Sequence, residues 1–276
     1  MSVRYRLSRL LGRDGRCLDV AIDHGVFGTA SFLPGIEDMR AAVATVVVAA
    51  PDAVQLAPGH APLLQEQPGR DKPALVLRVD VSNVYGPNPP AELCCVLLGD
   101  PVEQALALDA ACVVAFLLEV PGRPDLRRQC IENLSRLAPE CARRGMPLMV
   151  EPIALTPAGA AGHGVDGTPD TVAALVRQAV ELGADVIKAD PTEPLDELGR
   201  LAELCAGRPL LVRGGGRAPE AEILARTASC MALGASGIVY GRNIIQHPRP
   251  AAITRAFMAI VHDGLTAAEA MALLQA

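Results

Sequence analysis

Lysine is scarce in this chain of 276 residues. Of its 25 basic residues only Lys72 and Lys188 are lysines, and all the others are arginines. Tryptophan is absent, and aromatic residues make up only 3% of the chain. The formal net charge is −6, and the sequence contains no basic run or basic-aromatic cluster. These features argue against a nucleic acid as partner.

Long apolar segments are missing as well. No run reaches the ~18 consecutive apolar residues of a membrane span, and residues 1–6 lack the apolar stretch of a signal peptide. Eight cysteines are scattered without C-x-x-C spacing, which favours small buried side chains in a reducing compartment over a disulfide scaffold. We therefore expect a soluble, cytoplasmic protein without membrane contact.

Clustered histidines are also lacking. The five histidines show no H-x-x-x-H spacing, so the sequence predicts no metal site. The triplet Asp23-His24-Gly25 could be a fragment of one, but Asp23 as a proton-handling carboxylate is the better interpretation.

Half of the residues are apolar, and short apolar segments alternate with helical patterns. Their polarity does not alternate, which indicates strands buried on both faces of a parallel sheet. Eight such units in this length predict a single α/β domain, residues 1–276, folded as a (β/α)8 TIM barrel with a helical tail at about 249–276. A doubly wound open sheet is the alternative. The expected strands are 16–25, 52–56, 73–80, 111–120, 146–152, 185–188, 209–213 and 237–240. Residues 82–90 are expected to form a functional loop, and residues 156–168 a mobile one.

Lys188 ends the sixth expected strand, directly after Val186-Ile187 and before the turn signal Asp190-Pro191. An amine can lose its proton and attack a carbonyl, whereas a guanidinium cannot. We therefore interpret Lys188 as a Schiff-base nucleophile. The alternative is a salt-bridged or snorkelling lysine at the rim of the barrel.

Two carboxylates, Asp23 and Glu151, end the first and fifth expected strands. In such barrels the functional residues gather at the carboxyl ends of the strands. Asp23, Glu151 and Lys188 thus form a candidate set of acid, base and nucleophile. Asp23 could instead cap a helix, and Glu151 could form a salt bridge to an arginine such as Arg78 or Arg213.

Two glycine turns follow the seventh and eighth expected strands, at Gly214-Gly215-Gly216 and at Gly241-Arg242. Barrel enzymes commonly bind phosphate at these two loops. Backbone N–H groups would hold the phosphate and Arg242 would pair with its charge. Tight turns without a ligand are the alternative.

Several of these motifs together resemble a known family. Asp23-His24-Gly25, Ile187-Lys188, Gly215-Gly216 and the segment 237–246 are similar to class I aldolases of the DhnA/DeoC/LacD type. The resemblance implies a (β/α)8 barrel, a Schiff base on Lys188 and proton transfer by Asp23. It also implies a homo-oligomer that needs no metal or cofactor.

The same resemblance implies a phosphorylated sugar as substrate. The family pattern places its phosphate at Gly215, Gly216, Gly241 and Arg242, with Arg78 and Ser82 in contact with the substrate. We expect a lyase that cleaves a phosphorylated ketose to a three-carbon phosphate and an aldehyde. The alternatives are an autoinducer-type thiolase on the same scaffold and a non-catalytic sugar-phosphate-binding protein.

One position departs from the family pattern. Archaeal-type fructose-bisphosphate aldolases carry a tyrosine acid/base at the end of strand five, and this chain has Glu151-Pro152 there. A glutamate is similar to the tagatose-bisphosphate branch, although the strand-four lysine of that branch is absent from residues 111–120. Glu151 is therefore expected to take the proton-transfer role.

Overall fold

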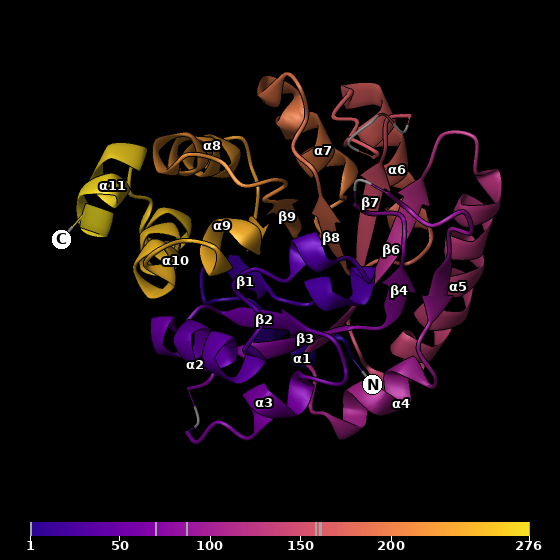
Figure 1. Ribbon diagram of the computed structural model, residues 1–276, viewed down its shortest axis with the longest axis horizontal. Coiled ribbons are helices and arrows are strands. Elements are labelled where there is room, and N and C mark those ends of the chain that lie inside the picture. The colour runs from indigo at the N-terminus through magenta and orange to yellow at the C-terminus, as the bar shows by residue number, and fades with distance from the viewer. Residues whose placement is uncertain (1, 70, 87, 158, 160–161, 276) are drawn as a thin grey trace.

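The computed structural model describes residues 2–69, 71–86, 88–157, 159 and 162–275 (Figure 1). In this part of the chain, eight parallel strands close into a barrel in the order β1-β10-β9-β8-β7-β6-β3-β2. The predicted (β/α)8 fold is confirmed. The strands are β1 (Cys17–Ala21), β2 (Ala53–Leu56), β3 (Ala74–Arg78), β6 (Cys112–Glu119), β7 (Leu148–Ala154), β8 (Val186–Ala189), β9 (Leu210–Arg213) and β10 (Gly237–Tyr240).

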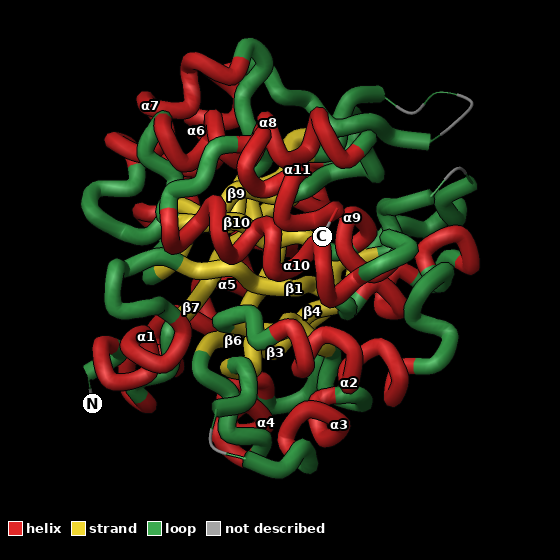
Figure 2. Tube along the Cα trace, turned by 90° about the vertical axis from the view of Figure 1, so that its left-hand side faces the viewer, coloured by secondary structure: helices red, strands yellow, loops and turns green. Residues whose placement is uncertain are grey.

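Burial on both faces explains why the strands lack alternating polarity. One set of side chains fills the barrel, where Val76, Cys112, Met149 and Leu211 are buried together. The other set belongs to the larger core cluster, which the strands share with the helices. Figure 2 shows these helices around the strands. Because both sets are buried, the strands are mostly apolar, and most of their polar residues lie in the half nearer the carboxyl edge.

Helices surround the barrel (Figure 1). The longest helix, α5 (Pro124–Arg144), is amphipathic and is followed by Gly145, whose positive φ of 65° suits a glycine. The helices between strands are α2 (Met39–Ala49), α3 (Ala61–Gln65), α4 (Pro101–Ala107), α5 (Pro124–Arg144), α6 (Pro169–Glu181), α7 (Leu198–Leu204) and α8 (Glu220–Ala232). None in the described residues is long and apolar enough to cross a membrane.

An N-terminal helix, α1 (Arg4–Leu10), was not expected from the sequence. It covers the amino end of the barrel, where Leu10 is fully buried in the same cluster as Cys17 and Cys112. The Arg6 guanidinium donates to the carbonyl of Ala110 at 2.7 Å. The spacing of Leu7 and Leu10 is the sequence signal for this helix.

A small hairpin, β4 (Asp80–Ser82) with β5 (Cys95–Leu97), was also not expected. The expected third strand, 73–80, ends at Arg78, and the hairpin frames most of the segment predicted as a functional loop. In that segment residue 87 lies outside the described residues. Residues 158, 160 and 161 of the predicted mobile loop lie outside them too, whereas Leu155 and Val165 form an antiparallel bridge.

The tail contains α9 (Arg242–Ile245), α10 (Pro250–Met258), a π-helix (Ala259–Asp263) and α11 (Ala267–Gln275). These elements pack beside α2 and α8 (Figure 1). His262 anchors the π-helix to the start of the barrel, because its Nδ1 lies 2.8 Å from Asp14 and its Nε2 lies 2.8 Å from Asp52. The Asp52 carboxylate also accepts from the Leu18 N–H at 2.7 Å.

This histidine predicts a pH dependence of stability. Hydrogen bonds and charge from Asp52 and Asp14 raise the pKa of His262 to about 9. Because the folded pKa lies above the unfolded value of 6.5, the stabilisation is fully present below pH 6.5 and is lost as the pH rises through 9. We expect wild type to lose roughly 2–3 kcal/mol more than His262→Gln between pH 6 and pH 10 in urea unfolding.

Exposed His60 provides the matched control. The variant His60→Gln should follow the wild-type pH profile. An equal loss of stability in wild type and His262→Gln would contradict the role of this contact.

Candidate active site

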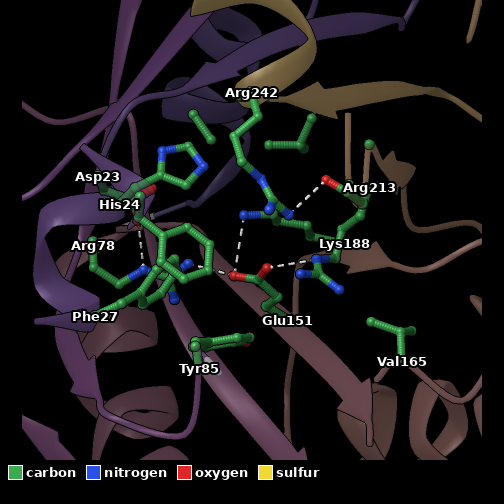
Figure 3. A pocket seen from close by; sticks show the side chains of 18 of the residues that line it. Asp23, His24, Phe27, Arg78, Tyr85, Glu151, Val165, Lys188, Arg213 and Arg242 are labelled. Carbon is green, nitrogen blue, oxygen red and sulfur yellow. Dashed lines mark hydrogen bonds and ion pairs between the residues drawn. The ribbon is translucent and has the colours of Figure 1, made fainter. Parts of the chain in front are cut away.

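A pocket of about 330 Å³ opens at the carboxyl ends of the strands. Its polar lining comes from strands far apart in the sequence (Figure 3). In barrel enzymes the functional residues gather at this edge of the strands. The charged or ionisable side chains that line it are Asp23, His24, Arg78, Tyr85, Glu151, His163, Lys188, Arg213 and Arg242.

Arg78 is the centre of an ion-pair network at the floor of this pocket. Its guanidinium contacts Asp23 at 2.8 Å, Asp80 at 3.2 Å and the Oε2 of Glu151. All four side chains are almost fully buried. The guanidinium also lies 4.0 Å from the ring of Phe116. One cation therefore bridges carboxylates from three separate segments of the chain and fixes their positions.

Lys188 lies on β8 and is 4% exposed. Its Nζ is 3.1 Å from the Oε2 of Glu151 and donates to the Oε1 of Gln55 at 3.1 Å. Burial lowers the pKa of Lys188, the Glu151 carboxylate opposes that shift, and the nearby Arg78 adds to it. A lowered lysine pKa increases the fraction of neutral amine, which is the nucleophilic form.

Glu151 is surrounded by three cations. Besides Arg78 and Lys188, Arg213 contacts its Oε1 at 2.9 Å. Burial alone would raise the pKa of Glu151, but the charges of Lys188, Arg78 and Arg213 outweigh burial and lower it. The salt bridges to Arg78 and Arg213 that the sequence offered as an alternative are thus both present. The carboxylate remains ionised at neutral pH and is a poor proton donor.

Asp23 contacts a different nitrogen of the Arg78 guanidinium from the one that contacts Glu151. Its Oδ2 accepts from the Gln55 amide at 2.7 Å, and that amide oxygen in turn accepts from Lys188. Burial would raise the pKa of Asp23, but the charge of Arg78 outweighs it and the pKa is lowered. Asp23 makes no side-chain cap to the short helix that follows it, so its carboxylate is directed to Arg78 and Gln55.

The two predicted glycine turns meet at one side of the pocket. Arg242 donates to the carbonyl of Gly215 at 2.9 Å, and its guanidinium lies 5.1 Å from the ring of Phe32. A Cβ at Gly241 would approach His24 Cε1 to 2.3 Å and the Ala21 carbonyl to 2.5 Å. Only glycine fits there. The four predicted residues Gly215, Gly216, Gly241 and Arg242 all line the pocket.

Comparisons with known proteins agree with this geometry. Residues 17–247 match the model of the DeoC/LacD family of aldolases. The chain belongs to this aldolase family.

Its relatives cover nearly the whole chain. An uncharacterized aldolase of Saccharolobus solfataricus is 30% identical over 98% of each chain. A 2-amino-3,7-dideoxy-D-threo-hept-6-ulosonate synthase of Halobacterium salinarum is 30% identical over 94% of this chain and 91% of its own. The chain is thus a class I aldolase, and the family resemblance read from the sequence is confirmed.

Solved structures support the same chemistry. An archaeal fructose 1,6-bisphosphate aldolase has a TM-score of 0.78 and 26% identity over 95% of this chain and all of its own. Another, solved with its catalytic lysine covalently bound to the carbinolamine intermediate of the substrate, has a TM-score of 0.77 and 26% identity over 94% of this chain and 99% of its own.

Ser82 is placed apart from the other predicted site residues of this aldolase. It is buried in the β4–β5 hairpin and is not among the described residues that line the pocket. Its hydroxyl faces its own loop, where it accepts from the Val84 N–H at 3.5 Å.

One unusual residue of the aldolase was not singled out from the sequence. Asp19 on β1 is fully buried, and neither carboxylate oxygen has a hydrogen-bond partner among the described residues. Burial raises the pKa of Asp19 to about 7, although the charge of Lys188 opposes the shift. A charged residue in the middle of an apolar strand was the available signal, since buried polar groups are rarely left unpaired.

Proposed function

We propose that this class I aldolase makes or cleaves a carbon–carbon bond in a phosphorylated ketose, with Lys188 as the Schiff-base lysine. The products of cleavage are a three-carbon phosphate and an aldehyde. The observation that carries the proposal is a buried lysine of lowered pKa at the carboxyl edge of the barrel, in the same pocket as Arg242 and the two glycine turns. Fructose 1,6-bisphosphate, the substrate named for the similar structures, supports a phosphorylated ketose.

The reaction follows from the positions of these groups. The neutral amine of Lys188 adds to the ketone to give a carbinolamine, whose hydroxyl takes up a proton and leaves as water, and an iminium ion results. The hydroxyl on the departing carbon gives its proton to a base in the pocket and becomes the aldehyde carbonyl. The electrons of the carbon–carbon bond move to the iminium, so the bond breaks, the aldehyde leaves and an enamine remains. Protonation of the enamine carbon and addition of water then release the three-carbon phosphate and restore the amine.

Glu151 is assigned the role of counter-ion in this scheme. Its Oε2 lies 3.1 Å from Nζ, so an ionised carboxylate would face the positive nitrogen of the iminium. Asp23, ionised and linked to Lys188 through Gln55, is assigned the transfer of protons. Arg242 and the turns at Gly215 and Gly241 are assigned to the phosphate.

The proposal also covers the cellular location and the assembly of the protein. The eight cysteines are all free, and seven are buried, as suits a reducing cytoplasm. A homo-oligomer is the assembly expected from the family resemblance.

Trapping with borohydride tests the function. The protein is incubated with fructose 1,6-bisphosphate, tagatose 1,6-bisphosphate or dihydroxyacetone phosphate, reduced, digested and analysed by mass spectrometry. We expect one reduced adduct, on the peptide that contains Lys188. Lys72 is an internal control, because it is the only other lysine of the chain and donates to the Gln65 carbonyl far from the pocket. Failure to trap an adduct with any phosphorylated ketose, or an adduct on Lys72 alone, would refute the proposal.

A further inference from the structure

Tyr85 carries a hydroxyl that the reaction above leaves without a task. The residue lies between β4 and β5 and lines the pocket. Its hydroxyl is buried and has no hydrogen-bond partner among the described residues. A buried hydroxyl normally has a partner, and its loss is costly. An unpaired one beside a binding pocket is therefore a candidate partner for a ligand that enters the pocket.

The loop around Tyr85 is fixed from both sides. The Asn83 amide donates to the Glu92 carbonyl at 2.8 Å and accepts from the Cys94 N–H, which closes the loop onto itself. The Thr29 hydroxyl donates to the Tyr85 carbonyl at 3.4 Å. Gly86 has a positive φ of 100°, and a Cβ there would approach Thr29 to 2.9 Å. The backbone of Tyr85 is therefore held in one place.

The ring of Tyr85 is fixed as well. It packs 4.4 Å from Phe27, 6.0 Å from Phe116 and 6.3 Å from Phe32, measured between ring centroids. These four rings make up most of the few aromatic residues of the chain. Figure 3 shows Tyr85 and Phe27 on the same side of Glu151. The packing limits rotation of the ring and so fixes the direction of its hydroxyl.

Burial keeps Tyr85 in the form that can donate a proton. Burial raises the pKa of Tyr85 well above its usual value of 10, so the phenol is protonated at neutral pH. Glu151 and Asp23 are in the opposite state, since nearby cations lower the pKa of each. The phenol can donate where these two carboxylates cannot. Arg213 is close enough to favour the phenolate electrostatically.

We infer that Tyr85 is a catalytic residue that protonates the aldehyde oxygen when the carbon–carbon bond forms. This inference rests on the proposed function. The enamine carbon attacks the aldehyde carbon, the new bond forms, and the carbonyl π electrons move to oxygen. That oxygen takes the phenol proton and becomes a hydroxyl. The phenolate then regains a proton from the base that removed one during enamine formation. Cleavage follows the same path in reverse, with the phenolate as proton acceptor.

The variant Tyr85→Phe removes the hydroxyl and keeps the ring. Three measurements with dihydroxyacetone phosphate separate the steps: borohydride trapping on Lys188, exchange of its α-hydrogens with deuterated water, and condensation with glyceraldehyde 3-phosphate. We expect trapping and exchange within about threefold of wild type and condensation slower by about 10²–10⁴-fold, the usual contribution of a positioned acid. Tyr5→Phe, at a tyrosine that is 74% exposed, should match wild type in all three.

The outcomes are distinguishable. Retained trapping shows that the variant is folded and its pocket intact. Condensation at the wild-type rate in Tyr85→Phe overturns the inference. Parallel loss of all three activities also overturns it, because it would place the hydroxyl in an earlier step or in the packing of the loop. Absence of an adduct in wild type overturns the proposed function, and this inference with it.

Discussion

Lys188→Met is expected to reduce turnover of a phosphorylated ketose by at least about 10⁴-fold, because no amine remains to form the iminium. Methionine has a similar length and no charge, and Arg78 and Arg213 still hold Glu151. Ligand binding should therefore weaken far less than turnover. Steady-state kinetics and isothermal calorimetry with the same ketose measure the two effects separately.

Two further variants sharpen this test. Lys188→Arg keeps the positive charge and removes the nucleophile, so it should be as inactive as Lys188→Met. Lys72→Met removes the other lysine and should leave turnover unchanged. Substantial activity in Lys188→Arg would show that the lysine acts only through its charge and would exclude a Schiff base at this position.

Arg78→Met is expected to lower the free energy of unfolding at pH 7 by about 3–5 kcal/mol, the usual cost of removing one partner from a buried ion pair. The substitution leaves Asp23, Asp80 and Glu151 facing one another without the cation that separates them. Urea unfolding monitored by circular dichroism measures the loss.

The loss should shrink as the pH falls. In wild type Arg78 lowers the pKa of Asp23 and of Glu151, so their stabilisation exists above the unfolded pKa values and disappears as the pH falls through the folded ones. Arg128→Ala is the control, since its pair with Glu132 is exposed and should contribute less than about 0.5 kcal/mol. A pH-independent loss in Arg78→Met would indicate that packing on Phe116 dominates over charge.

Much of the architecture could be predicted because the barrel imposes a simple pattern. Strands buried on both faces are apolar runs, and their observed bounds lie within a few residues of those expected. Functional residues of such barrels lie at the carboxyl edge, and this rule predicted that Lys188, Asp23 and Glu151 share one site before any contact was known. Both predictions, of the strands and of the site, depend on local sequence and on one property of the fold.

The remainder depends on contacts between distant residues. The sequence offered a salt bridge between Arg78 and Glu151 as an alternative. That Arg78 also joins Asp23 and Asp80 follows only when distant segments meet in the fold, and no local pattern encodes those contacts. The β4–β5 hairpin was overlooked because proline and asparagine obscure its short strands, and with it the position of Tyr85. Ser82 was expected at the substrate, but that hairpin directs it into its own loop.

The scarcity of aromatic residues has a practical consequence. Without tryptophan, the strongest ultraviolet fluorophores of this protein are its three tyrosines. Tyr5 is exposed and Tyr240 is hydrogen-bonded to Thr227 in the core, whereas Tyr85 lies in the pocket. The wild-type chain therefore contains its own optical probe of pocket occupancy, and Tyr85→Phe supplies the matching blank.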